Sequence, residues 1–304
     1  MARPAARPAH DACTLNTLSL FAGCVLIWGT TWLAITYQLG NVAPEASVSY
    51  RFLLAALLIA GYCRLRGLPM RFRAGEHAAL ALLGVLMYSI GYILVYHAEM
   101  HVVSGLLAVA YSAGPLLAML GMRLVFGHAM TARMAAGSLL GIAGIALVFW
   151  PEIGHAGHRG DFALGALLIV IAVLVSTAGM LVAHRNHERK LRGWPTMAWS
   201  MGYGGAASLV IALALGRTLS FEWSPAYLLS LLYLTVFGSI LGFAGFLTLL
   251  GRIGAARTSY IGVMVPIVAL VVSSLFEGFA WHALTLAGIG VSVAGNVLVL
   301  RRTG

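Results

Sequence analysis

The chain has 304 residues, of which 61% are hydrophobic and only 9% are charged, and its mean hydropathy is +0.92. A soluble domain carries roughly 25% charged residues and must present much of its surface to water, so this composition excludes a soluble fold. The formal charge of +10 does not indicate nucleic-acid binding, because the basic residues are scattered over short intervals between apolar runs instead of lying on one face.

The chain reads as a polar tail followed by ten apolar segments. Residues 1–16 are polar, contain proline and are predicted to form a cytoplasmic tail. A helix crosses the bilayer with about 20 apolar residues. The predicted spans are 17–37, 46–63, 77–97, 102–122, 134–150, 162–183, 195–215, 225–250, 256–276 and 283–300. No interval between them is long enough for a soluble domain, so we expect an all-α integral membrane protein with one membrane domain.

The basic residues alternate between the two sides of this arrangement. With the N-terminus inside, 16 of the 19 Lys and Arg residues fall on the inner side, and only Arg51, Arg159 and Arg217 do not. One missed or extra helix would spoil the alternation. The positive-inside rule therefore supports ten spans with both termini in the cytoplasm.

The sequence also contains an internal repeat. Residues 104–127 resemble residues 255–278 at a fixed offset of 151, which aligns Pro115 with Pro266 and, further on, 137–144 with 288–295. We expect one five-helix repeat over 17–150 and a second over 161–300. Because five is an odd number, the second copy enters the membrane from the opposite side. Inverted repeats of this kind are typical of secondary transporters, in which access alternates around a site between the halves.

Four places resemble the ten-helix EamA type of the drug/metabolite transporter superfamily. They are Leu26-Ile27-Trp28-Gly29-Thr30-Thr31-Trp32, Tyr50-Arg51-Phe52-Leu53-Leu54-Ala55-Ala56-Leu57, the prolines of Gly114-Pro115 and Val265-Pro266, and the glycine-rich stretches 137–144 and 288–295. The resemblance covers essentially the whole chain and implies an exporter in the inner (cytoplasmic) membrane. Within the superfamily the chain is similar to the YddG group of aromatic amino acid exporters.

The sequence departs from that pattern in two ways. The second half has no counterpart of Trp28 or Arg51, so substrate contacts are expected to be unequal between the halves. The first span also lacks the buried glutamate of the small multidrug relatives, and their proton-coupling mechanism is therefore not carried over.

Aromatic residues recur at helical spacing on three spans. Tyr88, Tyr92 and Tyr96 lie on one face of the third span, and the pairs Trp28/Trp32 and Trp199/Tyr203 repeat the spacing on the first and seventh. Such rings, with their hydroxyl or indole groups, could line a cavity for an aromatic or amphipathic solute. Membrane-interface belts are the alternative, especially for Tyr96 and Trp199. The predicted substrate-binding set is Trp28, Tyr88, Tyr92, Tyr96, Tyr111, Ser112, Trp199, Tyr203, Ser239 and Tyr260.

Arg51 is the most distinctive charged residue, because it lies one to two turns inside the second span. An intramembrane charge faces the bundle interior and has a partner, for which Glu45 and Glu99 are candidates, and this predicts a cavity-lining or gating role for Arg51. The alternative is that its long side chain extends to the interface. Pro115 and Pro266, with Gly114, are expected to form paired kinks beside the cavity or purely structural kinks. For the serines, bonding to helix carbonyls is the alternative to substrate contact.

The remaining polar residues give weaker signals. His97, Glu99, His101 and Glu277 gather near the outer ends and are interpreted as solvated loop residues, with a proton-linked role as the alternative. His155 and His158 have no metal-ligand spacing. The small residues at 137–141 and 288–292 predict close packing of the fifth and tenth spans within one molecule.

We therefore predict a secondary transporter that exports large neutral amino acids by alternating access. A multidrug or other metabolite exporter is the first alternative, and an intramembrane enzyme or lipid-handling protein the second. HExxH and phosphate-loop motifs are absent from the sequence, and no cofactor or metal is predicted. The expected partners are a small-molecule substrate and the bilayer, with a proton gradient or the membrane potential as driving force. The protein is expected to be a monomer.

Overall fold

The computed structural model describes residues 9–127, 129–155, 160–191 and 193–300. His158 and Arg159 lie outside the described part, and so do five of the 16 basic residues predicted on the inner side: Arg3, Arg7, Arg192, Arg301 and Arg302. The His155 side chain is also outside it. The first helix begins at Ala9, so residues 9–16, which the sequence analysis placed in the tail, continue the helix. Their hydropathy still separates them from the span itself, which begins at Asn16.

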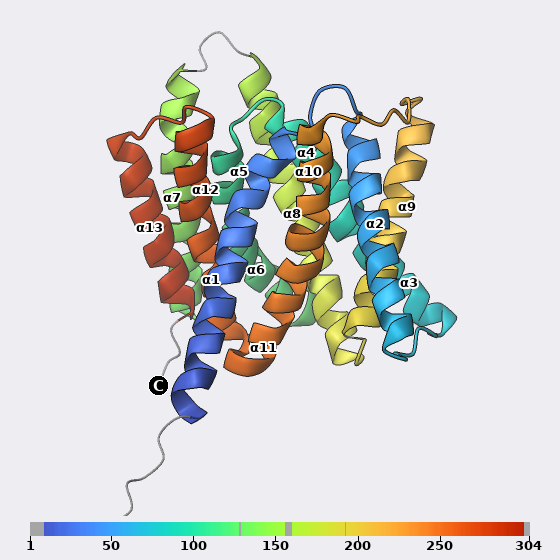
Figure 1. Cartoon of the computed structure of the whole chain (residues 1–304). Helices are drawn as coiled ribbons and strands as arrows, with labels where there is room; N and C mark the ends of the chain where they lie inside the picture. The colour runs from blue at the N-terminus through green and yellow to red at the C-terminus, as the bar shows by residue number, and fades with distance from the viewer. Residues whose placement is uncertain (1–8, 128, 156–159, 192, 301–304) are drawn as a thin grey trace, which may run out of the picture.

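Within the described residues every regular element is helical (Figure 1). The elements of the first half are α1 (Ala9–Thr36), α2 (Pro44–Leu65), α3 (Ala74–Val85), η1 (Leu86–Ile90), α4 (Gly91–Glu99), α5 (Ser104–Tyr111), α6 (Gly114–Phe126) and α7 (Ala132–His155). The elements of the second half are α8 (Gly160–Glu188), α9 (Trp194–Ala214), α10 (Pro225–Tyr233), η2 (Leu234–Leu241), α11 (Gly242–Thr258), α12 (Tyr260–Phe276) and α13 (Ala283–Leu300).

These elements form ten membrane-crossing segments, as the sequence predicted. Eight helical stretches are long and apolar enough to span a bilayer, and the apolar helices over 260–276 and 283–299 are shorter. Three spans are composite: α3, η1 and α4 form the third, α5 and α6 the fourth, and α10, η2 and α11 the eighth. Each predicted span overlaps its observed counterpart, because hydropathy and loop charge are strong signals in a membrane chain.

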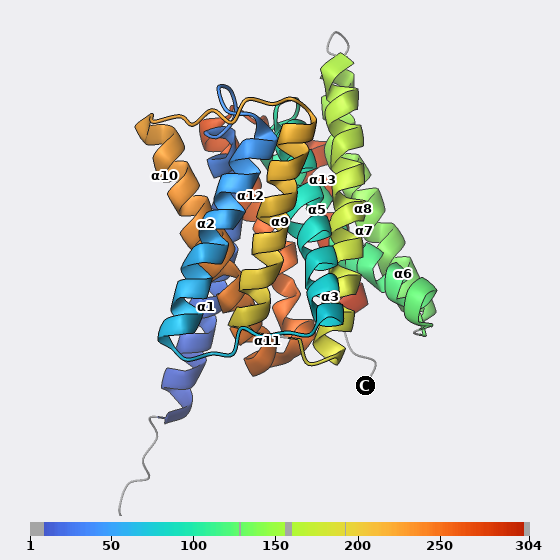
Figure 2. The same ribbon diagram turned by 90° about the vertical axis from the view of Figure 1, so that its right-hand side faces the viewer.

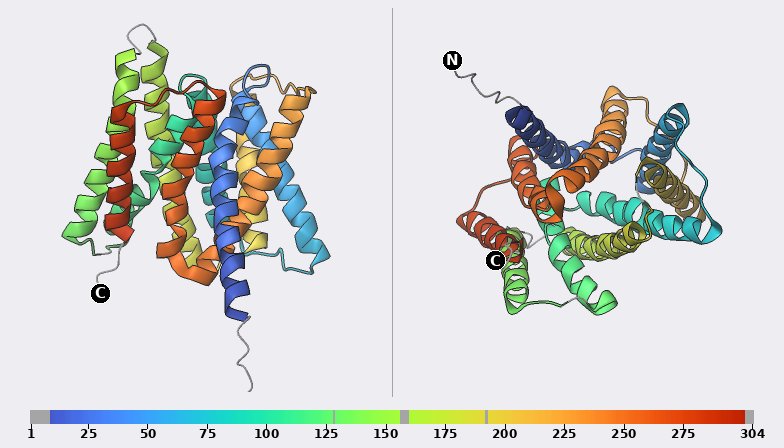
Figure 3. Two further views of the ribbon diagram at one scale, coloured as in Figure 1. Left: turned by 60° about the vertical axis from the view of Figure 1, so that its left-hand side comes forward. Right: turned by 90° about the horizontal axis from the view of Figure 1, so that it is seen from below.

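The two halves run in opposite directions through the bundle. In Figures 1 and 2, α1 rises from the end of the bundle where α13 finishes, whereas α8 descends from the opposite end. We call the first the terminus end and the second the far end. The halves are interleaved, since α2 packs along α9 and α7 along α13 (Figure 3). Five spans in each half produce this inverted arrangement.

Glycines allow α7 and α13 to touch backbone to backbone. A methyl group added at Gly144 would lie 2.3 Å from the Ser292 nitrogen, and one at Gly295 would lie 2.4 Å from the Gly141 nitrogen. Real side-chain carbons do not approach so closely, so only glycine fits this seam. The small-residue pattern therefore predicted the intramolecular helix pair correctly.

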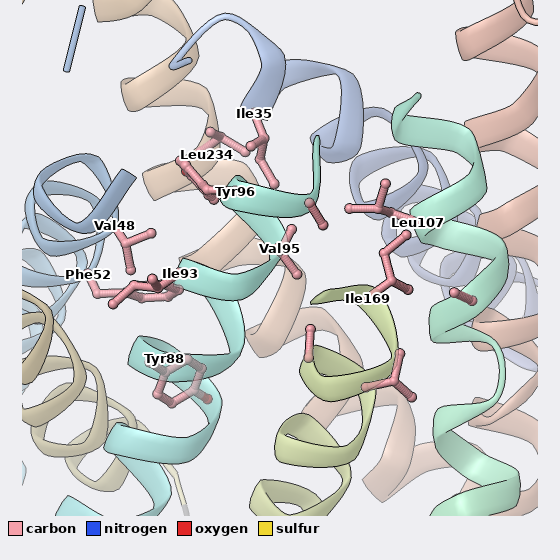
Figure 4. Close-up of a cluster of buried hydrophobic side chains, with 14 of the residues drawn as sticks. Ile35, Val48, Phe52, Tyr88, Ile93, Val95, Tyr96, Leu107, Ile169 and Leu234 are labelled. Carbon is pink, nitrogen blue, oxygen red and sulfur yellow. The ribbon is translucent and has the colours of Figure 1, made fainter. Parts of the chain in front are cut away.

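The outer surface is apolar and the interior is polar in places, the reverse of a soluble domain. Large aliphatic residues such as Leu57, Leu139 and Leu275 are exposed. They face the region that lipid would occupy. Hydroxyl side chains are instead fully buried between helices, among them Ser49, which donates to the Gly205 carbonyl. Figure 4 shows the main core cluster, where Tyr96 of α4 lies close to Ile35 of α1 and Leu234 of η2.

Candidate functional site

The guanidinium of Arg51 lies in the middle of four spans. It is seven residues, or about 10 Å, inside α2. Its side chain is 1% exposed, so it does not extend to the membrane interface. The Nε atom donates to Ser239 Oγ of η2 at 3.1 Å, and Cζ lies 4.6 Å from the centroid of the Tyr92 ring and 5.0 Å from that of Phe52. Hydrogen bonding and cation–π attraction thus hold a charge inside the bundle.

Two π-helical turns shape this part of the bundle. The N–H of Gly91 donates to the Leu86 carbonyl, and the N–H of Gly242 donates to the Phe237 carbonyl, so each bond spans five residues. Such turns widen a helix locally and are frequent at functional sites. In η2 the Ser239 hydroxyl donates to the Leu234 carbonyl, and the same oxygen accepts from Arg51.

The carbonyl of Gly238 also points out of the widened helix. It accepts from Trp28 Nε1 at 3.1 Å, which links α1 to η2. A methyl group at Gly238 would lie 3.3 Å from Arg51 Nη2 and 2.8 Å from the Thr31 methyl group. The absence of a side chain at this position therefore makes room for the guanidinium between α1, α2 and η2.

Six aromatic rings form a continuous line that ends at Arg51. Neighbouring centroids along it are 5.5, 5.4, 5.5, 5.2 and 4.9 Å apart. We call this set the aromatic line; in order its members are Phe246, Trp28, Phe243, Tyr88, Phe52 and Tyr92. The rings come from α1, α2, η1, α4 and α11, and they touch one another in this conformation, so the line is filled by its own side chains. Edge-to-face and tilted pairs of this spacing are favourable.

Polar contacts join the two halves at the far end. Ser47 of α2 and Tyr227 of α10 share a hydrogen bond of 2.9 Å. The Glu277 carboxylate, at the end of α12, accepts from the Ser104 backbone N–H at 3.1 Å and from its hydroxyl. A carboxylate at a helix N-terminus is stabilising, so Glu277 caps α5 across the boundary between the repeats.

The expectation that the acidic and histidine residues of this end are solvated is wrong for Glu99, the last residue of α4. Its side chain is 8% exposed, and neither carboxylate oxygen has a hydrogen-bond partner. Arg51 and Glu277 lie within electrostatic range of it. His97 is also engaged, through a 2.9 Å contact with Glu45. Hydropathy assigned Glu99 to a loop because it lies just beyond the predicted third span, whereas the neighbouring spans cover its side chain.

Glu45, one of the two predicted candidate partners of Arg51, does not pair with it. Its carboxylate contacts His97 and, at 3.7 Å, Arg217. No carboxylate among the described residues lies within 4.0 Å of the Arg51 guanidinium. Ser239 holds that guanidinium instead, because the π-turn of η2 directs its hydroxyl toward α2.

Trp199 and Tyr203 are not brought to the aromatic line. Trp199 Nε1 donates to the Met70 carbonyl at 2.9 Å, and the Tyr203 hydroxyl bonds His77 Nδ1 at 2.9 Å. Trp199 therefore packs against the connection between α2 and α3, and both rings contact His77 in the first turn of α3, at the terminus end. Their i, i+4 spacing gave the correct shared face, and that face contacts the start of α3.

Two other predicted residues lie apart from Arg51. Ser112 donates to the Val109 carbonyl at 2.6 Å and lines a void of about 20 Å³ between α5, α12 and α13. Tyr260 begins α12 and is half-buried near the terminus end. The geometry of Ser112 matches the carbonyl-bonding alternative for a serine in a helix.

Tyr111 takes an intermediate position. Its hydroxyl shares a 3.1 Å hydrogen bond with Ser176 of α8, and its ring lies 5.1 Å from that of Trp32. It therefore connects α1, α5 and α8 beside the aromatic line.

The two prolines occupy different local structures. Pro115 follows the turn at 112–113 and lies in the first turn of α6, after Gly114. Pro266 lies inside the continuous helix α12. The expected matching kinks are therefore not observed, because the break in the fourth span precedes Pro115 and allows a new helix to start there, whereas α12 runs through Pro266.

A groove of about 320 Å³ lies between α1 and α10, and its lining contains no member of the aromatic line. The hydrogen-bonded pair Thr30 and Tyr233 is in its lining. The exposed side chains of Tyr37 and Leu229 also line it, so it opens to the outside of the bundle. Within the described residues no group of three or more His, Cys, Asp or Glu side chains could hold a metal ion.

The repeat contains one further signal of this site, which was not among the predictions. The offset of 151 residues that defines the repeat also pairs Gly91 with Gly242 and Tyr92 with Phe243. The first pair closes the two π-turns, and the second supplies a ring from each half. Extending the repeat backwards would have pointed to both.

Ten spans in two inverted halves, with a buried arginine and aromatic rings where the halves meet, define a multi-pass transporter architecture. The chain belongs to the EamA-like transporter family, whose model matches residues 15–150 and 163–301. The resemblance to the EamA type is confirmed, and the family places the protein among transporters and not among enzymes.

Relatives of similar length support the assignment. The chain is 27% identical over 284 residues to the Escherichia coli (strain K12) protein described as "Uncharacterized inner membrane transporter YedA", covering 92% of this chain and 89% of that one. It is 25% identical to "Uncharacterized transporter YvbV" of Bacillus subtilis (strain 168), covering 93% and 91%. A solved crystal structure that is 16% identical superposes with a TM-score of 0.68, covering 93% of this chain and 96% of its own, and shows the same fold.

Proposed function

We propose that the protein is a secondary transporter of large neutral amino acids, aromatic ones above all, and that it exports them across the cytoplasmic membrane. The aromatic line that ends at Arg51 carries this proposal. Rings from both halves present an apolar, polarisable surface, and the guanidinium supplies one charge at its end. An amphipathic solute with an apolar body and a charged head matches that combination.

Alternating access would act at the boundary between the halves. In this conformation hydrogen bonds such as Ser47–Tyr227 and Ser104–Glu277 join the halves at the far end. The rings of the aromatic line are in mutual contact, so a substrate would have to separate them. We infer that opening of the far end breaks these contacts while the seam between α7 and α13 stays closed as a rigid support.

The orientation and the direction of transport are part of the proposal. The described basic residues of the inter-helix segments, such as Arg64, Arg123 and Arg185, lie at the terminus end. The positive-inside rule supports assigning that end to the cytoplasm. The description of YedA as an inner membrane transporter supports the location. Export rests on the resemblance to the amino acid exporters.

The test is uptake of labelled phenylalanine by proteoliposomes that contain the Tyr92→Leu protein. Loss of the Tyr92 ring, which contacts both Arg51 and Phe52, is expected to reduce uptake about 5- to 150-fold, because an edge-to-face aromatic contact and a cation–π contact together are worth about 1–3 kcal/mol. Tyr62→Leu is the control, since that ring is exposed and contacts Trp194. Equal uptake by both variants and the wild type would contradict the assigned path.

A further inference from the structure

We infer that Arg51 and Glu99 bind the two charges of a zwitterionic substrate, with the guanidinium taking the α-carboxylate and the carboxylate taking the α-ammonium group. This assignment rests on the proposed function and specifies its substrate site. We call the residues concerned, Gln38, Arg51, Tyr92, Tyr96 and Glu99, the head-group cluster.

The cluster gathers buried polar atoms that lack partners. Arg51 Nη1 and Gln38 Nε2 are unbonded donors, and both oxygens of Glu99 are unbonded acceptors. Gln38 and Arg51 are each 1% exposed. Buried polar groups are nearly always hydrogen-bonded, so unpaired donors and acceptors in one region indicate a missing partner.

The geometry of α4 places these groups along one stripe. Tyr92, Tyr96 and Glu99 are spaced i, i+4 and i+7, so they follow one another on a single helix face. The Arg51 guanidinium lies over the Tyr92 ring, and the Tyr96 hydroxyl donates to Gln38 Oε1 at 3.0 Å. Tyr96 and Glu99 both lie within electrostatic range of the Arg51 guanidinium. From the aromatic line outward, the order is therefore ring, guanidinium, hydroxyl and carboxylate.

Glu99 differs from the other acidic residues at the far end. Four acidic side chains are described there, and three of them have partners. Glu45 contacts His97 and Arg217, Glu222 accepts from Asn41 and Ser224, and Glu277 caps α5. Glu99 alone among these four has both oxygens free. A general requirement for charge at this end would not explain the difference, whereas a dedicated ligand group does.

A zwitterion satisfies both charges at once. The free Nη1 of Arg51 can donate to a carboxylate, and an ammonium group carries three donors for Glu99. The apolar side chain of the same molecule would then lie against Tyr92 and Phe52, where the aromatic line begins. An anion alone would leave Glu99 unpaired, and an organic cation alone would leave Arg51 unpaired. The cluster therefore favours amino acids over both.

The test compares three ligands that share a phenyl ring: phenylalanine, phenethylamine, which lacks the carboxylate, and 3-phenylpropionate, which lacks the ammonium group. Binding to purified protein is measured from the ligand-induced rise in unfolding temperature. The wild type is expected to bind phenylalanine about 10- to 100-fold more tightly than either analogue, the factor expected for one charged hydrogen-bonded contact.

Variants separate the two contacts. Arg51→Gln should weaken phenylalanine and 3-phenylpropionate about 10- to 100-fold and leave phenethylamine unchanged, whereas Glu99→Gln should weaken phenylalanine and phenethylamine and leave 3-phenylpropionate unchanged. Arg217→Gln and Glu45→Gln, which alter a charged pair at the same end, are the matched controls and should keep wild-type preferences. If Arg51→Gln does not fold, Arg51→Lys should show a smaller loss for the two carboxylate ligands only.

Two outcomes would overturn the assignment. Arg51 and Glu99 variants that weaken all three ligands equally would show a purely structural role, and variants with wild-type preferences would show no contact. In both cases a wild-type protein that still transports phenylalanine leaves the proposed function intact. A wild-type protein that neither binds nor transports phenylalanine would contradict the substrate class itself.

Discussion

The seam between α7 and α13 gives the sharpest quantitative prediction. A methyl group at Gly295 would lie 2.4 Å from the Gly141 nitrogen and 2.5 Å from the Gly137 oxygen, whereas one at Gly290, on the same helix, meets nothing within 4 Å. The atoms facing Gly295 belong to the backbone, so they cannot move aside by changing rotamer. The two helices must separate by about 1 Å, which forfeits contacts along the whole seam.

The expected magnitude follows from comparing the two alanine variants. Replacing glycine by alanine inside a helix stabilises it by up to about 1 kcal/mol, and this gain is common to both positions. Overpacking a closely packed site costs about 1–3 kcal/mol. Gly295→Ala should therefore be less stable than Gly290→Ala by about 1–3 kcal/mol.

The assay measures the unfolding midpoint in mixed detergent with an increasing fraction of dodecyl sulfate, and unfolding is monitored by tryptophan fluorescence. Gly295→Leu should fail to accumulate in the membrane, and Gly290→Leu should accumulate normally. Equal unfolding midpoints for the two alanine variants would refute the close backbone packing of α7 and α13 at Gly295.

Three further predictions concern other contacts. Ser239→Ala should destabilise the protein by about 1–3 kcal/mol, because it removes the hydrogen-bond partner of a buried guanidinium, whereas Thr248→Ala, at an exposed position, should not destabilise it. Equal unfolding midpoints for the two variants would contradict the Arg51–Ser239 contact. Glu277→Ala should lower stability more than Glu277→Gln, since glutamine retains an acceptor for the first turn of α5; the reverse order in thermal unfolding would exclude the cap. Tyr203→Phe should leave phenylalanine uptake unchanged, because its hydroxyl contacts His77 away from the aromatic line, and a several-fold loss of uptake would contradict that placement.

The fold was predictable because the signals are periodic and strong. Apolar length defined the ten spans, loop charge fixed their alternation, and the repeat required an inverted second half. The glycines of 137–144 and 288–295 predicted from the sequence that α7 and α13 pack together, since small residues three or four positions apart leave a flat helix face that another such face can cover closely.

The site was predictable only in part. Trp28/Trp32 and Trp199/Tyr203 share the same spacing, yet Trp28 belongs to the aromatic line and Trp32 packs on Tyr111, whereas the second pair lies at the terminus end. Spacing defines a face of a helix but does not say which neighbour covers it. The partner of Arg51 is equally inaccessible to local patterns, because Ser239 lies 188 residues away and its direction depends on a π-turn.

Glu99 shows a second limit. At the end of an apolar run a carboxylate is consistent with a loop, and only the packing of neighbouring spans buries it. Hydropathy describes one segment at a time, whereas burial at a span end depends on how far the surrounding helices extend.

Flux of labelled phenylalanine into proteoliposomes tests the central claim most directly, with empty liposomes as the reference and unlabelled tryptophan, methionine and threonine as competitors. The account predicts saturable uptake that unlabelled phenylalanine and tryptophan suppress more strongly than threonine does. Uptake no greater than that of empty liposomes, with and without a proton gradient, by protein shown to be folded would contradict the proposal that this EamA-family transporter carries large neutral amino acids.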